Sequence, residues 1–378
     1  MKIVEMVSTS IQACADRIYA VPGYPVNELV HLCGANLVIN EKVALELALG
    51  DSLASRRACV IVKHVGMNAL VDPLVHATFQ GLQAGVVIIC GDDPFAKNTL
   101  TVQDSRTFGP VAQIPVFDQI TGDTVKSAFD ASEEYSRVAL IRITAEDITK
   151  QTSTSLYNRT SNLAMRHEPG RLANPDLTLY GRAVLASKST SKLSDAGLAP
   201  LRNPPFLSSS LPVRRSERGS TLSLCRNCEF RILYELMRDG GLSAICDTGC
   251  SLIAMNHPFS FGVASYGMGS AIAVAATSTQ VALIGDYGIL HSGLQGLIEV
   301  YEKKIPLLCV VMVNRCMGMT GGQPTPDPAP YLTFAQPVRC DAHDRETLKR
   351  LLTIPARPTT LLVYGHCPEV INHETVAC

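Results

Sequence analysis

Short apolar runs rich in Val, Ile and Leu recur in two stretches of this chain, and segments long enough to form helices separate them. The runs expected to be strands are 58–64, 85–90 and 137–143 in the first stretch, and 243–246, 280–284, 307–313 and 360–364 in the second. Strands that are apolar at successive positions are typical of parallel sheets buried on both faces by helices. We therefore expect an α/β fold with two domains, each a mostly parallel sheet flanked by helices.

Between the two stretches, residues 151–220 are rich in Ser, Pro, Arg and Asn and show no sustained periodicity. Such a composition predicts a long linker that is partly disordered. A chain of 378 residues also suits two domains at roughly 100–200 residues each. The expected organisation is a domain over 1–150, a linker over 151–220 and a domain over 221–378.

The charge balance excludes some functions. There are 33 basic and 34 acidic residues, so no overall field favours nucleic acid or an anionic membrane. Charged residues make up 18% of the chain, which suggests a large area buried against a partner chain. The start of the sequence lacks a secretory signal and no run is long enough to span a membrane, so we expect a cytoplasmic protein. In that compartment the 13 cysteines would be thiols or metal ligands.

One pair of motifs follows two successive apolar runs of the second domain. Gly285, Asp286, Tyr287 and Gly288 come directly after the run 280–284, and Asn314 comes directly after the next run. Ligands of parallel sheets bind at the carboxyl ends of the strands, where both motifs are expected. A carboxylate and an amide oxygen there can share a Mg²⁺ ion that takes its other ligands from phosphates. A Gly-Asp pair alone is a common turn, but the spaced Asn indicates a magnesium–diphosphate site.

These motifs resemble the GDG…N signature of thiamine-diphosphate enzymes, with Tyr287 where many relatives have Gly or Ser. The surrounding segments GDYGILHSGLQGLIEV and VVMVNRCMGMTGGQPTP resemble the alpha subunit of indolepyruvate:ferredoxin oxidoreductase. In the first domain VPGYP and INEKVALELALGDSLASRRACVIVKHVGMNALVDPL resemble the pyrimidine-binding domain of the same subunit. The resemblance implies a pyrimidine-binding domain over 1–150, a diphosphate-binding domain over 221–378, and thiamine diphosphate with Mg²⁺ as cofactors.

The resemblance also assigns residues. In the first domain it implies that Glu41 contacts the aminopyrimidine ring of the cofactor. A carboxyl group there favours the imino form of the ring, which removes the proton from the thiazolium carbon. Without the resemblance, a Glu beside a Lys would be read as a solvated surface residue. The other residues expected to contact the cofactor are Gly23, Tyr24, Pro25, Gly285, Asp286, Tyr287, Gly288, Asn314, Met319 and Thr320.

For the magnesium ion, the expected ligands are Asp286, Asn314 and Cys316. Two histidines are further catalytic candidates, because His64 and His291 both follow apolar runs close to these motifs. Each could hydrogen-bond the substrate carboxylate or the cofactor. A structural role is the alternative for both.

Four cysteines resemble the ligands of a [4Fe–4S] cluster in the diphosphate-binding subunits of 2-oxoacid:ferredoxin oxidoreductases; they are Cys225, Cys228, Cys250 and Cys367. Arg226 and Asn227 replace the usual Pro-Gly between the first two, and Cys246 offers a competing thiol. Three interpretations stay open: a cluster, reduced core cysteines, or a structural zinc site.

Two parts of the family pattern have no counterpart in this sequence: the C-terminal ferredoxin-like domain and the middle domain. The function expected first is oxidative decarboxylation of an aryl 2-oxo acid such as indolepyruvate. CoA and ferredoxin are its expected partners, in a homodimer or in a heterotetramer with a second subunit. A non-oxidative decarboxylase of a small acidic 2-oxo acid is the second possibility, and a cofactor-binding regulatory protein without turnover is the third.

Overall fold

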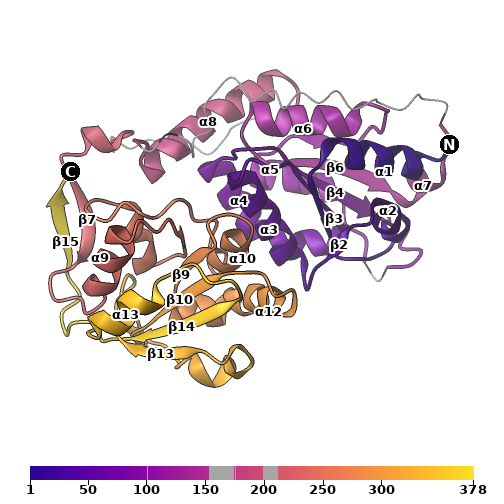
Figure 1. Cartoon of the computed structure of the whole chain (residues 1–378). Helices are drawn as coiled ribbons and strands as arrows, with labels where there is room; N and C mark the ends of the chain where they lie inside the picture. Colours follow the sequence, from indigo (N-terminus) through magenta and orange to yellow (C-terminus); the bar gives the residue numbers. More distant parts are fainter. Residues whose placement is uncertain (100, 153–173, 175, 199–211) are drawn as a thin grey trace. The chain divides into compact units, whose positions relative to one another are not determined.

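The computed structural model describes residues 1–99, 101–152, 174, 176–198 and 212–378 (Figure 1). The chain divides into two compact units, Met1–Val213 and Arg214–Cys378. In the described residues each unit is built around a parallel sheet, so the expected α/β class is confirmed. No helix in this part of the chain is both long and apolar enough to cross a membrane.

The sheet of the first unit has six strands in the order β2-β1-β3-β4-β6-β5, and all its pairs are parallel. The three predicted runs become its central strands, which are buried at nearly every position because helices cover both faces. The short outer strands were not predicted. The bounds are β1 Arg17–Ala20, β2 Asn36–Leu37, β3 Ala58–Lys63, β4 Val86–Asp92, β5 Val116–Phe117 and β6 Ala139–Thr144.

Helices cover this sheet on both faces. One apolar core joins α1 (Ile3–Cys14), α2 (Asn27–Cys33) and α6 (Thr124–Glu134) to alternate residues of the central strands. The intervening residues are buried as well, and α3 (Glu41–Leu53) packs on β1 and β3 while α4 (Val71–Gln80) packs on α3. A 3₁₀ helix over His64–Leu70 follows β3, and α5 (Phe108–Ala112) and α7 (Ala145–Thr149) are short.

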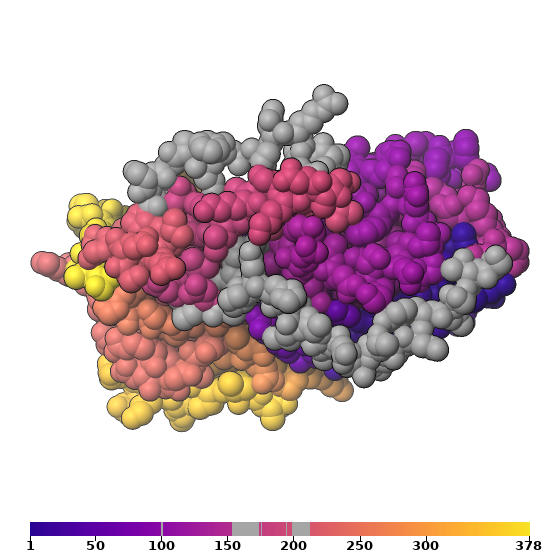
Figure 2. Space-filling model, turned by 90° about the horizontal axis from the view of Figure 1, so that it is seen from above, coloured from indigo at the N-terminus to yellow at the C-terminus, as the bar shows by residue number. Residues whose placement is uncertain are grey.

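The predicted linker contains a folded helix. α8 (Leu179–Asp195) lies inside the range 151–220 and packs against α4 at the surface of the first unit (Figure 2). The side chain of Arg137 is fully buried beneath it and donates to the carbonyl of Ala186 and to Oγ1 of Thr190, both at 2.9 Å. Because the buried guanidinium of Arg137 takes two of its hydrogen-bond acceptors from α8, this helix is part of the first unit and not of a linker. Residues 153–173, 175 and 199–211 of the predicted linker lie outside the described residues.

The second unit has a five-stranded parallel sheet in the order β13-β14-β10-β9-β8. One core packs α9 (Arg231–Asp239) and α13 (Arg345–Leu351) on it, and α10 (Ala271–Ala276) and α12 (Leu294–Glu302) pack together beside β9. All four runs predicted here are strands of this sheet. The strands of the unit are β7 Ser220–Cys225, β8 Ile245–Cys246, β9 Val281–Gly285, β10 Leu308–Val313, β11 Cys316–Met317, β12 Gln323–Pro324, β13 Val338–Asp341, β14 Thr359–Tyr364 and β15 His373–Ala377.

Parallel pairing brings the carboxyl ends of β8, β9, β10 and β14 to one edge of this sheet. Two small antiparallel pairs complete the unit: β11 with β12, and β7 with β15. The segments that follow the four strand ends carry the predicted metal and cysteine motifs. This edge is therefore where a ligand of an open α/β sheet binds.

Candidate active site

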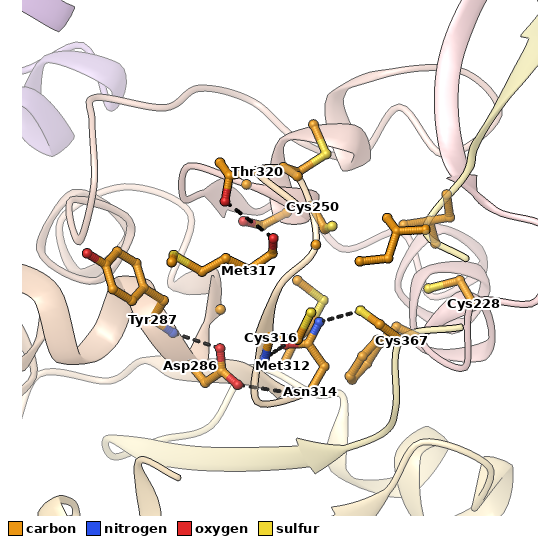
Figure 3. Close-up of a pocket in the computed structure, with 18 of the residues that line it drawn as sticks. Cys228, Cys250, Asp286, Tyr287, Met312, Asn314, Cys316, Met317, Thr320 and Cys367 are labelled. Carbon is orange, nitrogen blue, oxygen red and sulfur yellow. Dashed lines mark hydrogen bonds between the residues drawn. The ribbon is translucent and has the colours of Figure 1, made fainter. Parts of the chain in front are cut away.

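A cavity of about 260 Å³ lies at this edge of the second unit (Figure 3). Its wall combines the segments after β8, β9, β10 and β14 with the turn between β7 and α9. The two predicted motifs of this unit therefore meet in one place. The predicted site residues that line the cavity are Gly285, Asp286, Tyr287, Gly288, Asn314, Cys316, Met319, Thr320, Cys225, Cys228, Cys250 and Cys367.

Asp286 joins the ends of β9 and β10. One carboxylate oxygen, Oδ2, accepts the backbone N–H groups of Asn314 and Arg315 at 3.1 and 2.6 Å, and Oδ1 accepts that of Tyr287 at 2.8 Å. The side chain is buried, and this burial raises the pKa of its carboxyl group. Neutral N–H donors offset only part of the cost of burying a carboxylate. A divalent cation would offset more of it, so the donor set fits Mg²⁺.

Asn314 connects this carboxylate to the cysteines. Its amide Nδ2 donates to Sγ of Cys367 at 2.8 Å, and its Oδ1 accepts the backbone N–H of Cys316 at 3.3 Å. The Cys316 carbonyl accepts the N–H of Gly318 at 3.1 Å. The metal motif and the cysteine motif are therefore linked through one side chain.

The four predicted cluster cysteines all line the cavity. Burial raises the pKa of the Cys228 thiol to about 11, and that of the Cys250 and Cys367 thiols to about 12. Gly318 lies between two of these thiols. A Cβ atom there would be 3.4 Å from Sγ of Cys367 and 3.7 Å from Sγ of Cys250.

Two further observations bear on the cysteines. The competing thiol, Cys246, is fully buried and points to the carbonyl of Ala244, so it does not line the cavity. Among the described residues, no group of three or more His, Cys, Asp or Glu side chains is placed to hold a metal ion.

Some lining residues escaped the sequence prediction. His373 on β15 places Nε2 3.6 Å from Sγ of Cys250, and pairing of β15 with β7 sets His373 opposite Cys225. That contact joins residues far apart in the chain, so no local pattern could have signalled it. The other unpredicted residues whose side chains contribute sulfur to the lining are Met268, Met312 and Met317.

His291 lies in a π-helical turn, Ile289–Gly293, and is not among the residues that line the cavity. Its ring centroid is 5.6 Å from that of Tyr287, which does line the cavity. The hydroxyl of Ser292 donates to the carbonyl of Met268 at 2.5 Å, and Nδ1 of His291 lies 3.1 Å from the same hydroxyl oxygen. Because the only hydroxyl proton is used by the carbonyl, Nδ1 must be the donor in the second bond. Nε2 of the neutral ring then carries the lone pair.

In the first unit, Glu41 is the first residue of α3. The side chain of Asn40 caps this helix by accepting the N–H of Val43 at 2.8 Å. The Glu41 side chain packs directly on Gly66, where an added Cβ atom would overlap Oε1. The carboxylate of Glu41 therefore lies against the backbone of Gly66.

Gly23, Tyr24 and Pro25 form a turn beyond the carboxyl end of β1, closed by a bond from the N–H of Val26 to the carbonyl of Gly23 at 2.9 Å. Pro25 packs on Gly91, at the carboxyl end of β4. The predicted cofactor residues of this unit thus stand at the edge where parallel sheets bind ligands.

His64 has a different environment. It is fully buried, and its Nδ1 and Nε2 atoms each lie 3.2 Å from a backbone carbonyl, those of Gly91 and Thr101. The ring lies between these two carbonyls, and its contact with Gly91 joins the ends of β3 and β4; a neutral ring has one N–H and donates to only one of the carbonyls. This geometry favours the structural alternative for His64 over contact with substrate.

Residues 247–344 match the family model described as thiamine pyrophosphate enzyme, C-terminal TPP binding domain. The match covers Asp286, Asn314 and the loops around them. The chain is also 35% identical over 150 residues to the indolepyruvate oxidoreductase subunit IorA of Archaeoglobus fulgidus. Residues 247–344 are thus similar to a thiamine-diphosphate-binding domain, and the chain is similar in sequence to IorA subunits.

The alignment with the A. fulgidus subunit covers 35% of this chain and 24% of that relative. A longer alignment, with the IorA subunit of Methanothermobacter thermautotrophicus, covers 90% of this IorA-like chain and 77% of the relative at 22% identity. Among solved structures, a thiamine diphosphate-dependent 4-hydroxybenzoylformate decarboxylase of Rhodococcus jostii has a TM-score of 0.66. The two structures match over 98% of this chain and 100% of the decarboxylase, at 11% sequence identity. This likeness shows a shared fold.

Proposed function

We propose that this IorA-like chain is the thiamine-diphosphate- and Mg²⁺-binding subunit of an enzyme that oxidatively decarboxylates an aryl 2-oxo acid such as indolepyruvate. The observation that carries the proposal is the cavity at the carboxyl edge of the second sheet. Its wall holds both Asp286 and Asn314 and the cysteines Cys228, Cys250 and Cys367. A cofactor that releases electrons and a cluster that accepts them would therefore be neighbours.

In this proposal Asp286 and Asn314 hold Mg²⁺ through side-chain oxygens, and the backbone N–H groups near Gly285 and Gly288 face the diphosphate. When bound, thiamine diphosphate supplies the electron sink that lets a 2-oxo acid lose CO₂. Glu41 holds its carboxyl group ready for the ring nitrogen of the pyrimidine. Within the described ranges the Glu41 carboxylate forms no ion pair and no hydrogen bond. It is therefore available to the ring nitrogen of the pyrimidine, which supports this role.

The chemistry of the cysteines supports a [4Fe–4S] cluster, although within the described residues their side chains are not gathered into a metal-holding group. Thiolates are the usual ligands of such clusters, and these four thiols surround one cavity. Asn314 donates to Sγ of Cys367 at 2.8 Å, so one cluster ligand would be hydrogen-bonded to a residue of the magnesium motif. Such a hydrogen bond tunes the reduction potential of a cluster.

The proposal also includes partners and location. The IorA relatives are named as subunits, which supports a second subunit in the complete enzyme, with ferredoxin as electron acceptor and CoA as an acyl acceptor to be tested. A dimer that places Glu41 of one chain opposite Asp286 of another is part of the same proposal. A cytoplasmic location is part of the same proposal, and the free cysteines agree with it.

Iron analysis combined with a turnover assay tests the proposal. The chain is purified without oxygen, iron and acid-labile sulfide are measured, and CO₂ release is followed for a panel of 2-oxo acids with and without CoA and a viologen dye. We expect a brown protein and dye reduction with aryl 2-oxo acids once the second subunit is added. A colourless protein that releases CO₂ and an aldehyde without the dye would instead indicate the non-oxidative decarboxylase.

A further inference from the structure

Lys63 is the last residue of β3 and stands at the carboxyl edge of the first sheet, where the predicted cofactor residues of this unit lie. Its register partner on β4 is Gly91, and on the other side of β3 the strand β1 leads into the turn that contains Gly23. Three residues after Lys63, Gly66 packs on the Glu41 side chain. Because three residues span at most about 11 Å, the lysine and the proposed pyrimidine-binding carboxylate share one small region of this edge.

The side chain of Lys63 is partly buried and lies across the turn that follows β1. A Cβ atom added at Gly23 would be 2.7 Å from Cδ of Lys63, 3.1 Å from Cγ and 3.3 Å from Cβ. The aliphatic stem therefore packs on the Gly23 backbone, in space that is open because this residue has no side chain. This contact places the outer part of the stem beside the turn beyond the carboxyl end of β1.

The charge of Lys63 is a second, independent observation. Within the described residues its ammonium group forms no ion pair and donates no hydrogen bond. Lys42, the lysine beside Glu41, differs, because its Nζ atom lies 2.6 Å from Oε1 of Glu46 and 3.3 Å from Oδ2 of Asp72. Two carboxylates already bind Lys42, whereas the cation of Lys63 is available to an anionic ligand.

Glu41 packs on Gly66 and Lys63 packs on Gly23, so the two opposite charges stand on different glycines. We propose that Lys63 binds the carboxylate of the 2-oxo acid substrate while Glu41 contacts the pyrimidine ring of the cofactor. This inference rests on the proposed function, from which it takes the substrate. A lysine ammonium group suits such a ligand, because it is a compact cation with three N–H donors and its hydrogen bonds to a carboxylate are charge-assisted.

The chemistry of decarboxylation determines which kinetic constant Lys63 controls. The negative charge of the substrate carboxylate is present in the bound 2-oxo acid and absent from the product CO₂. An ammonium group beside that carboxylate therefore stabilises the bound substrate at least as much as the transition state. Interactions of this kind lower KM and do not raise kcat. The role of Lys63 is then to select acids over neutral analogues, and its loss should appear mainly in KM.

Steady-state kinetics of the complete enzyme, with its second subunit, test the assignment on phenylpyruvate. Lys63→Met should raise KM roughly 10- to 100-fold, the range for a lost hydrogen bond to a charged group, and change kcat less than about threefold. Lys63→Arg, which keeps the charge, should recover most of the affinity. Lys97→Met is the matched control, because it removes the cation of an exposed lysine from the loop after β4, and it should leave KM unchanged.

A binding measurement separates this inference from the proposed function. 3-Phenylpropanoate has the carbon skeleton of phenylpyruvate without the keto group, and 3-phenylpropanamide is its neutral counterpart. Calorimetry on the cofactor-loaded enzyme should show that the unmodified protein binds the acid at least roughly 10-fold more tightly than the amide. Lys63→Met should bind the two compounds alike. An enzyme that releases no CO₂ from any 2-oxo acid would refute the proposed function and leave this comparison intact.

Three results would overturn the assignment of Lys63. They are no preference for the acid in the unmodified enzyme, an undiminished preference in Lys63→Met, and an equal loss of preference in Lys97→Met, which would indicate attraction by the general field of the protein. Melting temperatures of the variants are compared with that of the unmodified enzyme. Lys63→Gln takes the place of Lys63→Met if that variant does not fold.

Discussion

The side chain of Glu41 lies directly against the backbone of Gly66, where an added Cβ atom would overlap Oε1 and approach Cγ to 2.6 Å. Contacts this short leave no room for a methyl group. The 3₁₀ turn after β3 therefore packs against the carboxylate at the start of α3. If Glu41 has the catalytic role proposed above, Gly66 would influence the position of its carboxylate.

The first prediction follows from this contact. Gly66→Ala should move the Glu41 carboxylate and lower turnover roughly 10- to 100-fold, because small misplacements of a reacting group cost that much. Thiamine diphosphate should still bind, since Asp286 is untouched. Steady-state CO₂ release and cofactor titration measure the two effects separately.

A double-mutant comparison shows whether the effect passes through Glu41. Glu41→Gln alone should cut turnover by orders of magnitude while cofactor binding is kept, and adding Gly66→Ala should lower it little further. Gly296→Ala is a matched control, because its nearest neighbours lie at an ordinary 3.5 Å. Fully additive losses would show that Gly66 acts independently of the carboxylate.

The second prediction concerns the helix found in the predicted linker. Arg137→Met should lower the free energy of unfolding by about 3 kcal/mol, because the carbonyls of Gln113 and Ala186 lose a charged donor in a buried place. Urea unfolding measures the loss, and proteolysis should cut near α8 faster. The exposed Arg106→Met should change stability by less than about 1 kcal/mol. Equal effects of the two substitutions would contradict the role given to Arg137.

The third prediction concerns the proton on His291. Removing the hydroxyl by Ser292→Ala should shift the neutral ring from the Nδ1–H form towards the Nε2–H form that free imidazole side chains favour in water. Nitrogen-15 spectra of a histidine-labelled chain report the tautomer, and His291→Asn identifies the signal. Ser278→Ala, which removes a comparable hydroxyl-to-carbonyl bond on Val274, should leave that signal unchanged. An unaltered tautomer in Ser292→Ala would refute the assignment.

Much of the fold was readable from the sequence, because buried parallel strands need continuous apolar runs. The strands β3, β4, β6, β9, β10 and β14 all coincide with such runs. The two-residue strands β2 and β5 did not stand out, since so short a segment has no periodicity. α8 was missed because its partner is Arg137, and a contact between segments that far apart leaves no local pattern.

Part of the candidate site could likewise be predicted from the sequence, and part could not. Asp286 and Asn314 could be predicted because each directly follows a strand, and parallel pairing then forces them together. The hydrogen bond from Asn314 to Cys367 and the approach of His373 to Cys250 could not, because they depend on the register of β14 and β15. His64 shows that a position directly after a strand does not by itself predict contact with a ligand. Its ring follows β3 and yet lies between two backbone carbonyls.

The central claim is that Asp286 binds the metal that holds the cofactor diphosphate, and thermal unfolding with and without thiamine diphosphate and Mg²⁺ tests it most directly. At about 100 times the dissociation constant, the ligand should stabilise the native chain by about 2.7 kcal/mol, which for 378 residues raises the melting temperature by roughly 3–4 °C. Asp239→Ala, which changes an exposed carboxylate of α9, should keep the full shift. Asp286→Ala should abolish it, and an undiminished shift in that variant would contradict the account.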